Sequence, residues 1–147
     1  MKNIVWLASY PKSGNTWIRA ILYSAIHGKL NLDDIGTMMP SFGSFVSALA
    51  DNNALELPSA MALWPEAQER LSSSTQNGRI ILKTHNSLCE FNGNPFPDPK
   101  ITVGAIYVIR DARDVAISYS NHFGKRDINA AIDSLLNDQN TLIDPHK

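Results

Sequence analysis

The chain has 147 residues, of which 44% are hydrophobic, and this suffices for one globular domain with a single core. Thirteen basic and fourteen acidic residues give a formal net charge of −1, so the composition lacks the global basic field used for nonspecific binding to nucleic acid or anionic membranes. The single cysteine, Cys89, rules out an intramolecular disulfide, and the apolar run after Lys2 is too short for a signal peptide or a membrane span. We therefore expect a cytoplasmic protein without nucleic-acid or membrane partners, and the sequence specifies no oligomeric state.

The first predicted element is a buried strand that leads through a turn into a helix. Residues 3–9 (NIVWLAS) are continuously apolar and β-branched, as in the central strand of a parallel sheet. In residues 10–17 (YPKSGNTW), a lysine and small polar residues precede a helical pattern that stops at Gly28. Backbone N–H groups at a helix start are unpaired and lie at the positive end of the helix dipole. This order favours phosphate binding over a plain connecting turn.

Residues 29–64 lack a clean periodicity and predict short helices and loops. Their large apolar side chains are most simply interpreted as core, and the second interpretation is the wall of a substrate pocket. These side chains are Met38, Met39, Phe42, Phe45 and Trp64. A short polar helix is expected from Pro65 to about Ser73, because proline is tolerated at the first helical position.

Two further strands end in polar residues. Residues 79–84 (RIILKT) predict a second buried strand, and alternation along it predicts that Lys83 and His85 share a face. Residues 92–99 (NGNPFPDP) are expected to form a loop. The third strand is expected over residues 101–109 (ITVGAIYVI).

A helix is expected after the third strand. Asp111 is the expected N-cap of a helix over residues 112–122, with Arg113 paired to nearby acids on a solvated face, and a last helix is expected over 128–136. Strands that alternate with helices predict an α/β fold, with a parallel β-sheet and flanking helices joined by right-handed crossovers. Ligands of such sheets bind beyond the carboxyl ends of the strands, where all three polar clusters fall.

Three motifs in this order, YPKSGNTW, LKTH and YVIRDARDVAISY, resemble the sulfotransferase family, which uses 3′-phosphoadenosine 5′-phosphosulfate (PAPS) as sulfuryl donor. The resemblance covers roughly residues 3–124. It implies a sulfotransferase of the cytosolic type with a P-loop NTPase-like fold. It implies sulfuryl transfer to a hydroxyl or amine of a small-molecule acceptor. Family members carry a further basic, glycine-containing segment toward the C-terminus. We therefore expect residues 1–147 to form a single sulfotransferase-like domain with a truncated sulfotransferase fold, which corresponds to the N-terminal portion of the full family domain.

The resemblance also implies roles for individual residues. The 5′-phosphosulfate is expected to bind the segment Lys12, Ser13, Gly14, Asn15, Thr16 and Trp17, with the Trp17 ring against the adenine. Arg110 and Ser118 are expected to bind the 3′-phosphate. His85 is the expected general base, with Lys12 as the stabiliser of the departing oxygen and Lys83 assisting.

The chemistry of these side chains suits the roles. Sulfuryl transfer depends on positioning and on stabilisation of charge at the departing oxygen, and the Lys12 ammonium is a compact cation. An imidazole with an ordinary pKa of about 6.5 can take a proton from an acceptor near neutrality, and the Arg110 fork matches two phosphate oxygens. Each of these residues could instead have only a structural role. Lys12 could be an exposed turn lysine, His85 could be a structural histidine, and the Ser118 hydroxyl group could donate to a carbonyl oxygen of its own helix.

Two other functional classes remain open. A P-loop kinase or nucleoside triphosphatase would carry G-x-x-x-x-G-K-[ST], whereas Lys12 precedes Gly14 in this chain. A noncatalytic nucleotide-binding or interaction domain left by truncation is the other class. The histidines at positions 27, 85, 122 and 146 have no metal-ligand spacing, so we predict no metal.

Overall fold

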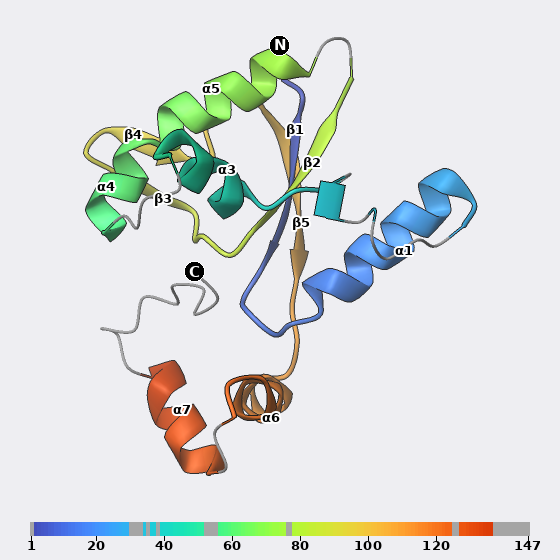
Figure 1. Cartoon of the computed structure of the whole chain (residues 1–147), viewed down its shortest axis with the longest axis vertical. Helices are drawn as coiled ribbons and strands as arrows, with labels where there is room; N and C mark the ends of the chain where they lie inside the picture. The colour runs from blue at the N-terminus through green and yellow to red at the C-terminus, as the bar shows by residue number, and fades with distance from the viewer. Residues whose placement is uncertain are drawn as a thin grey trace.

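Three parallel strands form the central sheet of the structure, a computed structural model (Figure 1). β1 (Ile4–Ser9) lies between β2 (Ile80–Thr84) and β5 (Thr102–Val108), and both pairings are parallel. The α/β class and the central position of the first strand are confirmed. The structure describes residues 2–29, 34, 36–37, 39–51, 56–75, 78–124 and 127–136.

The helices agree closely with the apolar patterns that predicted them. Gly28 ends the first helix with a left-handed φ of 73°, and Asp111 caps a later one by accepting a hydrogen bond from the Arg113 N–H over 2.9 Å. Within the described ranges, no helix is both long and apolar enough to cross a membrane. The helices are α1 (Asn15–His27), α3 (Phe42–Leu49), α4 (Leu57–Ala62), α5 (Trp64–Ser74), α6 (Ala112–His122) and α7 (Ile128–Leu136).

Different elements cover the two faces of the sheet (Figure 1). Trp6 is the register partner of Leu82 on one face, and Leu7 is the partner of Lys83 on the other. The first face packs against α3 and α5, whereas α1 contacts the second. The main core therefore lies on the Trp6 face, and its buried residues are Ile4, Trp6, Phe42, Val46, Trp64, Ala67, Leu71, Leu82 and Phe96.

A small antiparallel hairpin occupies part of the segment that was predicted to be a loop. β3 (Cys89–Phe91) pairs with β4 (Asn94–Phe96) around Asn92 and Gly93, so the loop prediction for residues 92–99 is wrong for residues 94–96. The two turn residues have positive φ angles of 49° and 79°, as a two-residue hairpin turn of type I′ requires. The hairpin carries Phe96 into the core, where its side chain is 1% exposed.

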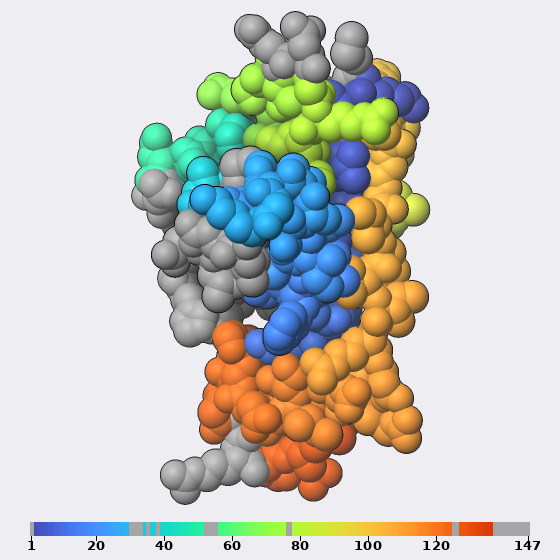
Figure 2. All heavy atoms as spheres, turned by 90° about the vertical axis from the view of Figure 1, so that its right-hand side faces the viewer, coloured from blue at the N-terminus to red at the C-terminus, as the bar shows by residue number. Residues whose placement is uncertain are grey.

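β5 is covered poorly on both of its faces. Val103 and Ile106 are each 40% exposed, and Tyr107 is 64% exposed. Figure 2 shows this strand running uncovered along one side of the molecule. The predicted strand is therefore present, but its apolar side chains face outward, unlike those of most parallel strands.

Candidate functional site

The loop of residues 10–14, which joins β1 to α1, is a tight turn with two left-handed residues. Lys12 has a φ of 66° and Gly14 a φ of 105°, and the Ser13 N–H donates to the Tyr10 carbonyl oxygen over 3.2 Å. A Cβ added at Gly14 would meet no atom within 4 Å, so glycine is needed there for backbone conformation and not for space. A left-handed lysine is uncommon, and such strained residues cluster at functional sites.

α1 begins directly after this loop. Gly14 is its N-cap residue, no side chain caps it, and the Ile18 N–H donates to the Gly14 carbonyl oxygen over 3.1 Å. The N–H groups of residues 15–17 therefore have no partner inside the helix and lie at the positive end of its dipole. The predicted order of strand, turn and helix start is confirmed.

Asn15 differs from the other predicted phosphate ligands because its side chain turns inward. The residue is 6% exposed, and its Nδ2 donates to the Leu7 carbonyl oxygen and to Ser9 Oγ, over 3.2 Å in each case. Its Oδ1 is buried and has no hydrogen-bond partner among the described residues. The amide thus ties the start of α1 to the end of β1, and only the backbone N–H of Asn15 remains at the helix start.

The other residues of the predicted donor segment differ in exposure. Ser13 is buried, whereas Thr16 is exposed. Trp17 is 76% exposed, so its indole ring forms an open flat surface at the start of α1. The contact between this ring and an adenine stays a prediction.

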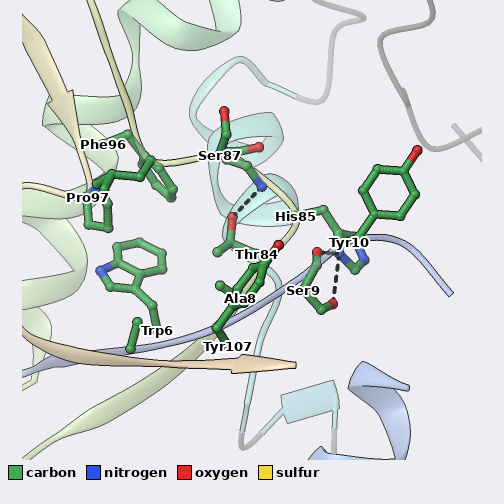
Figure 3. A pocket seen from close by; sticks show the side chains of 13 residues that line it. Trp6, Ala8, Ser9, Tyr10, Thr84, His85, Ser87, Phe96, Pro97 and Tyr107 are labelled. Atoms are coloured by element: carbon green, nitrogen blue, oxygen red, sulfur yellow. Dashed lines mark hydrogen bonds between the residues drawn. The ribbon is translucent and has the colours of Figure 1, made fainter. Parts of the chain in front are cut away.

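His85 follows β2 and is held against the end of β1 (Figure 3). Its Nδ1 lies 2.7 Å from the Ser9 carbonyl oxygen and 3.3 Å from Ser9 Oγ. A carbonyl oxygen can only accept, so we assign the hydrogen to Nδ1 and the lone pair of the neutral ring to Nε2. The predicted base therefore contacts the residue immediately before the loop of residues 10–14.

Lys83 occupies the other face of the sheet. It is half-buried beside its register partner Leu7, and its N–H donates to the Pro40 carbonyl oxygen over 2.9 Å. Because β2 ends at Thr84, strand alternation does not extend to His85. His85 borders the pocket described below and Lys83 is not among its lining residues, so the pocket does not bring these two predicted catalytic residues together.

Arg110 connects the end of β5 to the same loop. Its Nη1 donates to the Lys12 carbonyl oxygen over 3.2 Å, across 98 residues of sequence. Its Nε lies 3.8 Å from Asp114 Oδ2, which orients the guanidinium from α6. The loop, Arg110 and His85 thus meet at the carboxyl ends of the three strands, where the predicted polar clusters were expected.

The remaining polar residues of α6 have simpler roles. Arg113 Nη2 lies 2.6 Å from Asp111 Oδ2, and hydrogen bonds from Arg113 lower the pKa of the Asp111 carboxyl group. The prediction that Arg113 pairs with a nearby acid is confirmed. Ser118 is half-buried on α6, and its role at a 3′-phosphate stays a prediction. Among the residues that the structure describes, no group of histidine, cysteine and carboxylate side chains could hold a metal ion.

A pocket of about 430 Å³ opens beside His85 on the Trp6 face of the sheet (Figure 3). Trp6, Phe96 and Pro97 form an apolar end, and Ser9, Tyr10 and His85 form a polar end. Among the described residues that line it there is no lysine, arginine or carboxylate, so these walls suit an uncharged, largely apolar molecule. Its lining residues are Trp6, Ala8, Ser9, Tyr10, Thr84, His85, Asn86, Ser87, Leu88, Phe96, Pro97, Ala105 and Tyr107.

The apolar residues predicted between positions 29 and 64 are core and do not line this pocket. Phe42 is fully buried, and its ring centroid lies 5.2 Å from that of Trp6. The ring centroids of Trp64 and Phe96 are 4.9 Å apart. The interpretation as core is therefore confirmed for Met39, Phe42 and Trp64, and the second interpretation, as a pocket wall, is wrong for them. Met38 lies outside the described residues.

The Tyr10 hydroxyl group stays neutral over a wide pH range. Burial, and then the charge of ionised Tyr119, raise the Tyr10 pKa above its ordinary value of 10.0. A neutral phenol can donate a hydrogen bond, and in Figure 3 the Tyr10 hydroxyl group points away from the apolar end of the pocket.

Sequence reasoning missed Ser9 and the aromatic residues that line the pocket. In the sequence, Ser9 is the last residue of a predicted buried strand. Its position directly before a phosphate-type turn could have marked its hydroxyl group as a candidate for the site. Trp6 and Phe96 come from separate strands, and Phe96 reaches the pocket through the unpredicted hairpin.

The comparison with protein families agrees with this geometry. The family model described as the sulfotransferase domain matches residues 2–143, nearly the whole chain. No curated protein matches the chain. With a parallel α/β sheet that brings a phosphate-type loop, an imidazole and a guanidinium to one edge, the chain belongs to the sulfotransferase domain family.

Proposed function

We propose that this chain transfers a sulfuryl group from PAPS to a hydroxyl or amine of a small-molecule acceptor. The observation that carries the proposal is the pair of hydrogen bonds joining His85 to Ser9 and Arg110 to Lys12. These bonds bring a base, a cationic loop and a guanidinium to one edge of the sheet. Membership of the sulfotransferase domain family supports the reaction class.

The loop of residues 10–14 and the start of α1 are the proposed binding site for the donor. Free N–H groups at the helix start and the Lys12 ammonium suit the 5′-phosphosulfate. The Arg110 guanidinium, which already lies against this loop, suits the 3′-phosphate, with Ser118 as a second donor. The exposed ring of Trp17 offers a stacking surface for the adenine.

In the proposed reaction, a bond forms between the acceptor oxygen or nitrogen and sulfur while the bond from sulfur to the bridging phosphate oxygen breaks. His85 Nε2 takes the proton of the acceptor group, since Nδ1 is engaged with Ser9. Lys12 stabilises the negative charge on the bridging oxygen as adenosine 3′,5′-bisphosphate leaves. Lys83, on the neighbouring strand, is proposed to assist through its charge.

The pocket beside His85 is the proposed acceptor site. Its polar end carries the base, and its apolar end is closed by Trp6 and Phe96. An acceptor that places its hydroxyl or amine at His85 would lay an apolar body against these rings. The described lining residues include no lysine, arginine or carboxylate, which favours uncharged acceptors over charged ones.

The test is sulfuryl transfer from radiolabelled PAPS to a panel of uncharged alcohols, phenols and amines. His85→Gln is expected to lower kcat by about 10²- to 10⁴-fold, the usual contribution of a general base. His27→Gln is the matched control, because His27 ends α1, about 18 Å along the helix from its start. Wild-type turnover in His85→Gln would reject the mechanism.

The 3′-phosphate assignment has its own test by calorimetry. Adenosine 3′,5′-bisphosphate is expected to bind more tightly than adenosine 5′-phosphate, and Arg110→Ala is expected to abolish that preference. Arg70→Ala is the control, because Arg70 forms an exposed pair with Glu66 on α5. Equal affinities for the two nucleotides in the wild-type chain would reject the assignment. Nucleotide binding without transfer to any acceptor would instead favour a noncatalytic nucleotide-binding domain.

A further inference from the structure

A buried chain of hydrogen bonds runs behind the His85 ring. The Asn15 amide donates to Leu7 and to Ser9 Oγ, and both oxygens of Ser9 face Nδ1 of His85. Asn15 is 6% exposed and Ser9 is 3% exposed, so solvent does not compete for the bonds of the Asn15 amide, whereas the exposed His85 residue forms the solvent end of the chain. The chain links the first residue of α1 to the ring of the proposed base.

The orientation of the Asn15 amide is fixed by its partners. The Leu7 carbonyl oxygen can only accept, so the atom 3.2 Å from it must be Nδ2 and not Oδ1. This orientation leaves Oδ1 buried without a hydrogen-bond partner in the described chain, which is unfavourable. A leucine or alanine would avoid that cost, so the amide is better explained by what its Nδ2 group holds than by packing.

The Ser9 hydroxyl group is held in turn. Because Oγ accepts from Asn15 Nδ2 over 3.2 Å, its position near His85 Nδ1 is fixed by α1 and not by rotation about its own side chain. The Ser9 carbonyl oxygen, 2.7 Å from Nδ1, belongs to the central strand and cannot move. Two oxygens from one buried residue thus face the same ring nitrogen.

We propose that Ser9 and Asn15 are positioning residues that hold His85 in the tautomer with hydrogen on Nδ1 and the basic lone pair on Nε2. The ring can then accept a proton at Nε2 without rotating, since its Nδ1–H bonds persist in the charged form. The same Asn15 stands at the start of α1, so the helix end proposed to bind the donor also sets the orientation of the base. This inference depends on the proposed function for its catalytic meaning.

The tautomer can be observed directly in the full chain by nitrogen-15 NMR of the imidazole rings at about pH 8.5, where an ordinary imidazole is neutral. The chain has four histidines, and His85→Gln assigns the signal. The wild-type ring is expected in the Nδ1–H form. Ser9→Ala and Asn15→Leu are expected to move part of the population to the Nε2–H form, Ser9→Ala the more because it removes the hydroxyl group that faces Nδ1, whereas Asn15→Leu only releases that group.

Turnover gives the second readout. Ser9→Ala is expected to lower kcat about fivefold to tenfold with the KM for PAPS changed by less than about twofold, since the hydroxyl group faces the base and the proposed acceptor pocket and not the proposed donor loop. Ser9→Thr, which keeps the hydroxyl group, is expected to restore both the tautomer and kcat. Ser73→Ala, at an exposed position on α5, is the matched control.

The outcomes separate this inference from the proposed function. A wild-type ring in the Nε2–H form, or unchanged tautomer populations in both folded variants, would overturn the positioning role. If one variant fails to fold, as judged by its backbone amide spectrum, the other decides. In a further outcome, the wild-type chain shows the Nδ1–H form and Ser9→Ala changes it, while no sulfuryl group is transferred. This outcome would overturn the enzyme proposal, but it would support the role of the hydrogen-bond chain in orienting the ring.

Discussion

Replacing Phe96 by alanine should destabilise the fold and open the proposed acceptor pocket at the same time. The Phe96 side chain is 1% exposed, and its ring centroid lies 4.8 Å from that of Trp6, 5.1 Å from Phe42 and 4.9 Å from Trp64. Truncation of a buried phenylalanine costs about 3–5 kcal/mol, and the simultaneous loss of three aromatic contacts favours the upper half of that range. We therefore expect a loss of about 4 kcal/mol in the free energy of unfolding.

Urea denaturation followed by tryptophan fluorescence measures this loss. The midpoint should fall while the slope m stays unchanged, because the native fold exposes a similar surface on unfolding. Leu136→Ala, at a position 74% exposed on α7, is the control and should change the unfolding free energy by less than about 0.5 kcal/mol. A loss below about 1 kcal/mol for Phe96→Ala would refute the reasoning, since it would mean that the ring does not hold the hairpin against the sheet.

The same variant tests the pocket. Removal of the Phe96 ring should raise KM for the acceptor and leave the affinity for adenosine 3′,5′-bisphosphate unchanged, because Phe96 lies at the apolar end and the proposed donor loop lies beyond the polar end. Phe96→Leu, which keeps most of the buried surface, should show both effects in weaker form. Equal loss of donor and acceptor affinity would contradict the separation of the two sites.

Three further changes have defined outcomes. Lys12→Ala should lower kcat about 10²- to 10³-fold in the radiolabelled-donor assay, as expected for a group that stabilises developing charge, whereas Lys29→Ala, beyond the end of α1, should not change it. Asn3→Ala should lower the free energy of unfolding by about 2 kcal/mol in urea titrations, because buried Asn3 donates to the Ser72 carbonyl oxygen over 2.7 Å and accepts from its hydroxyl group over 2.8 Å. The raised Tyr10 pKa favours the neutral phenol in the folded state, so its stabilisation is present below pH 10 and is lost as the pH rises through the folded value. Tyr10→Phe should therefore shift alkaline unfolding, followed by circular dichroism, to higher pH, and an unchanged midpoint would contradict this explanation.

The regular elements could be predicted because their local signals agreed with the tertiary structure. The apolar run before the phosphate-type turn gave the central strand, Gly28 ended the first helix, and Asp111 capped a later one. The hairpin around Asn92 and Gly93 was missed because the prolines nearby favoured a loop. An Asn-Gly pair is itself a hairpin signal, and here it outweighed them.

The residues of the candidate site could be named from the sequence motifs, but their arrangement in space could not. Lys12, His85 and Arg110 belong to motifs, and their convergence follows from the parallel sheet. The inward turn of Asn15 and the pocket walls depend on side-chain packing between segments far apart in the sequence. Lys83 shows the limit of period-two reasoning, because β2 ends between it and His85 and alternation no longer applies.

The bare edge of β5 has a consequence for the chemistry of the neighbouring pocket. Tyr107 lines the pocket from this strand and is 64% exposed, and β5 is the edge strand of the described sheet, so bulk water reaches the pocket wall past this edge. In wet surroundings a reactive sulfuryl donor is open to hydrolysis, and each charge in the site is weakened by the high dielectric of water. In the proposed reaction, a polypeptide segment laid along that edge would exclude water from the pocket, strengthen the proposed attraction of Lys12 for the departing oxygen and reduce the loss of the donor to hydrolysis.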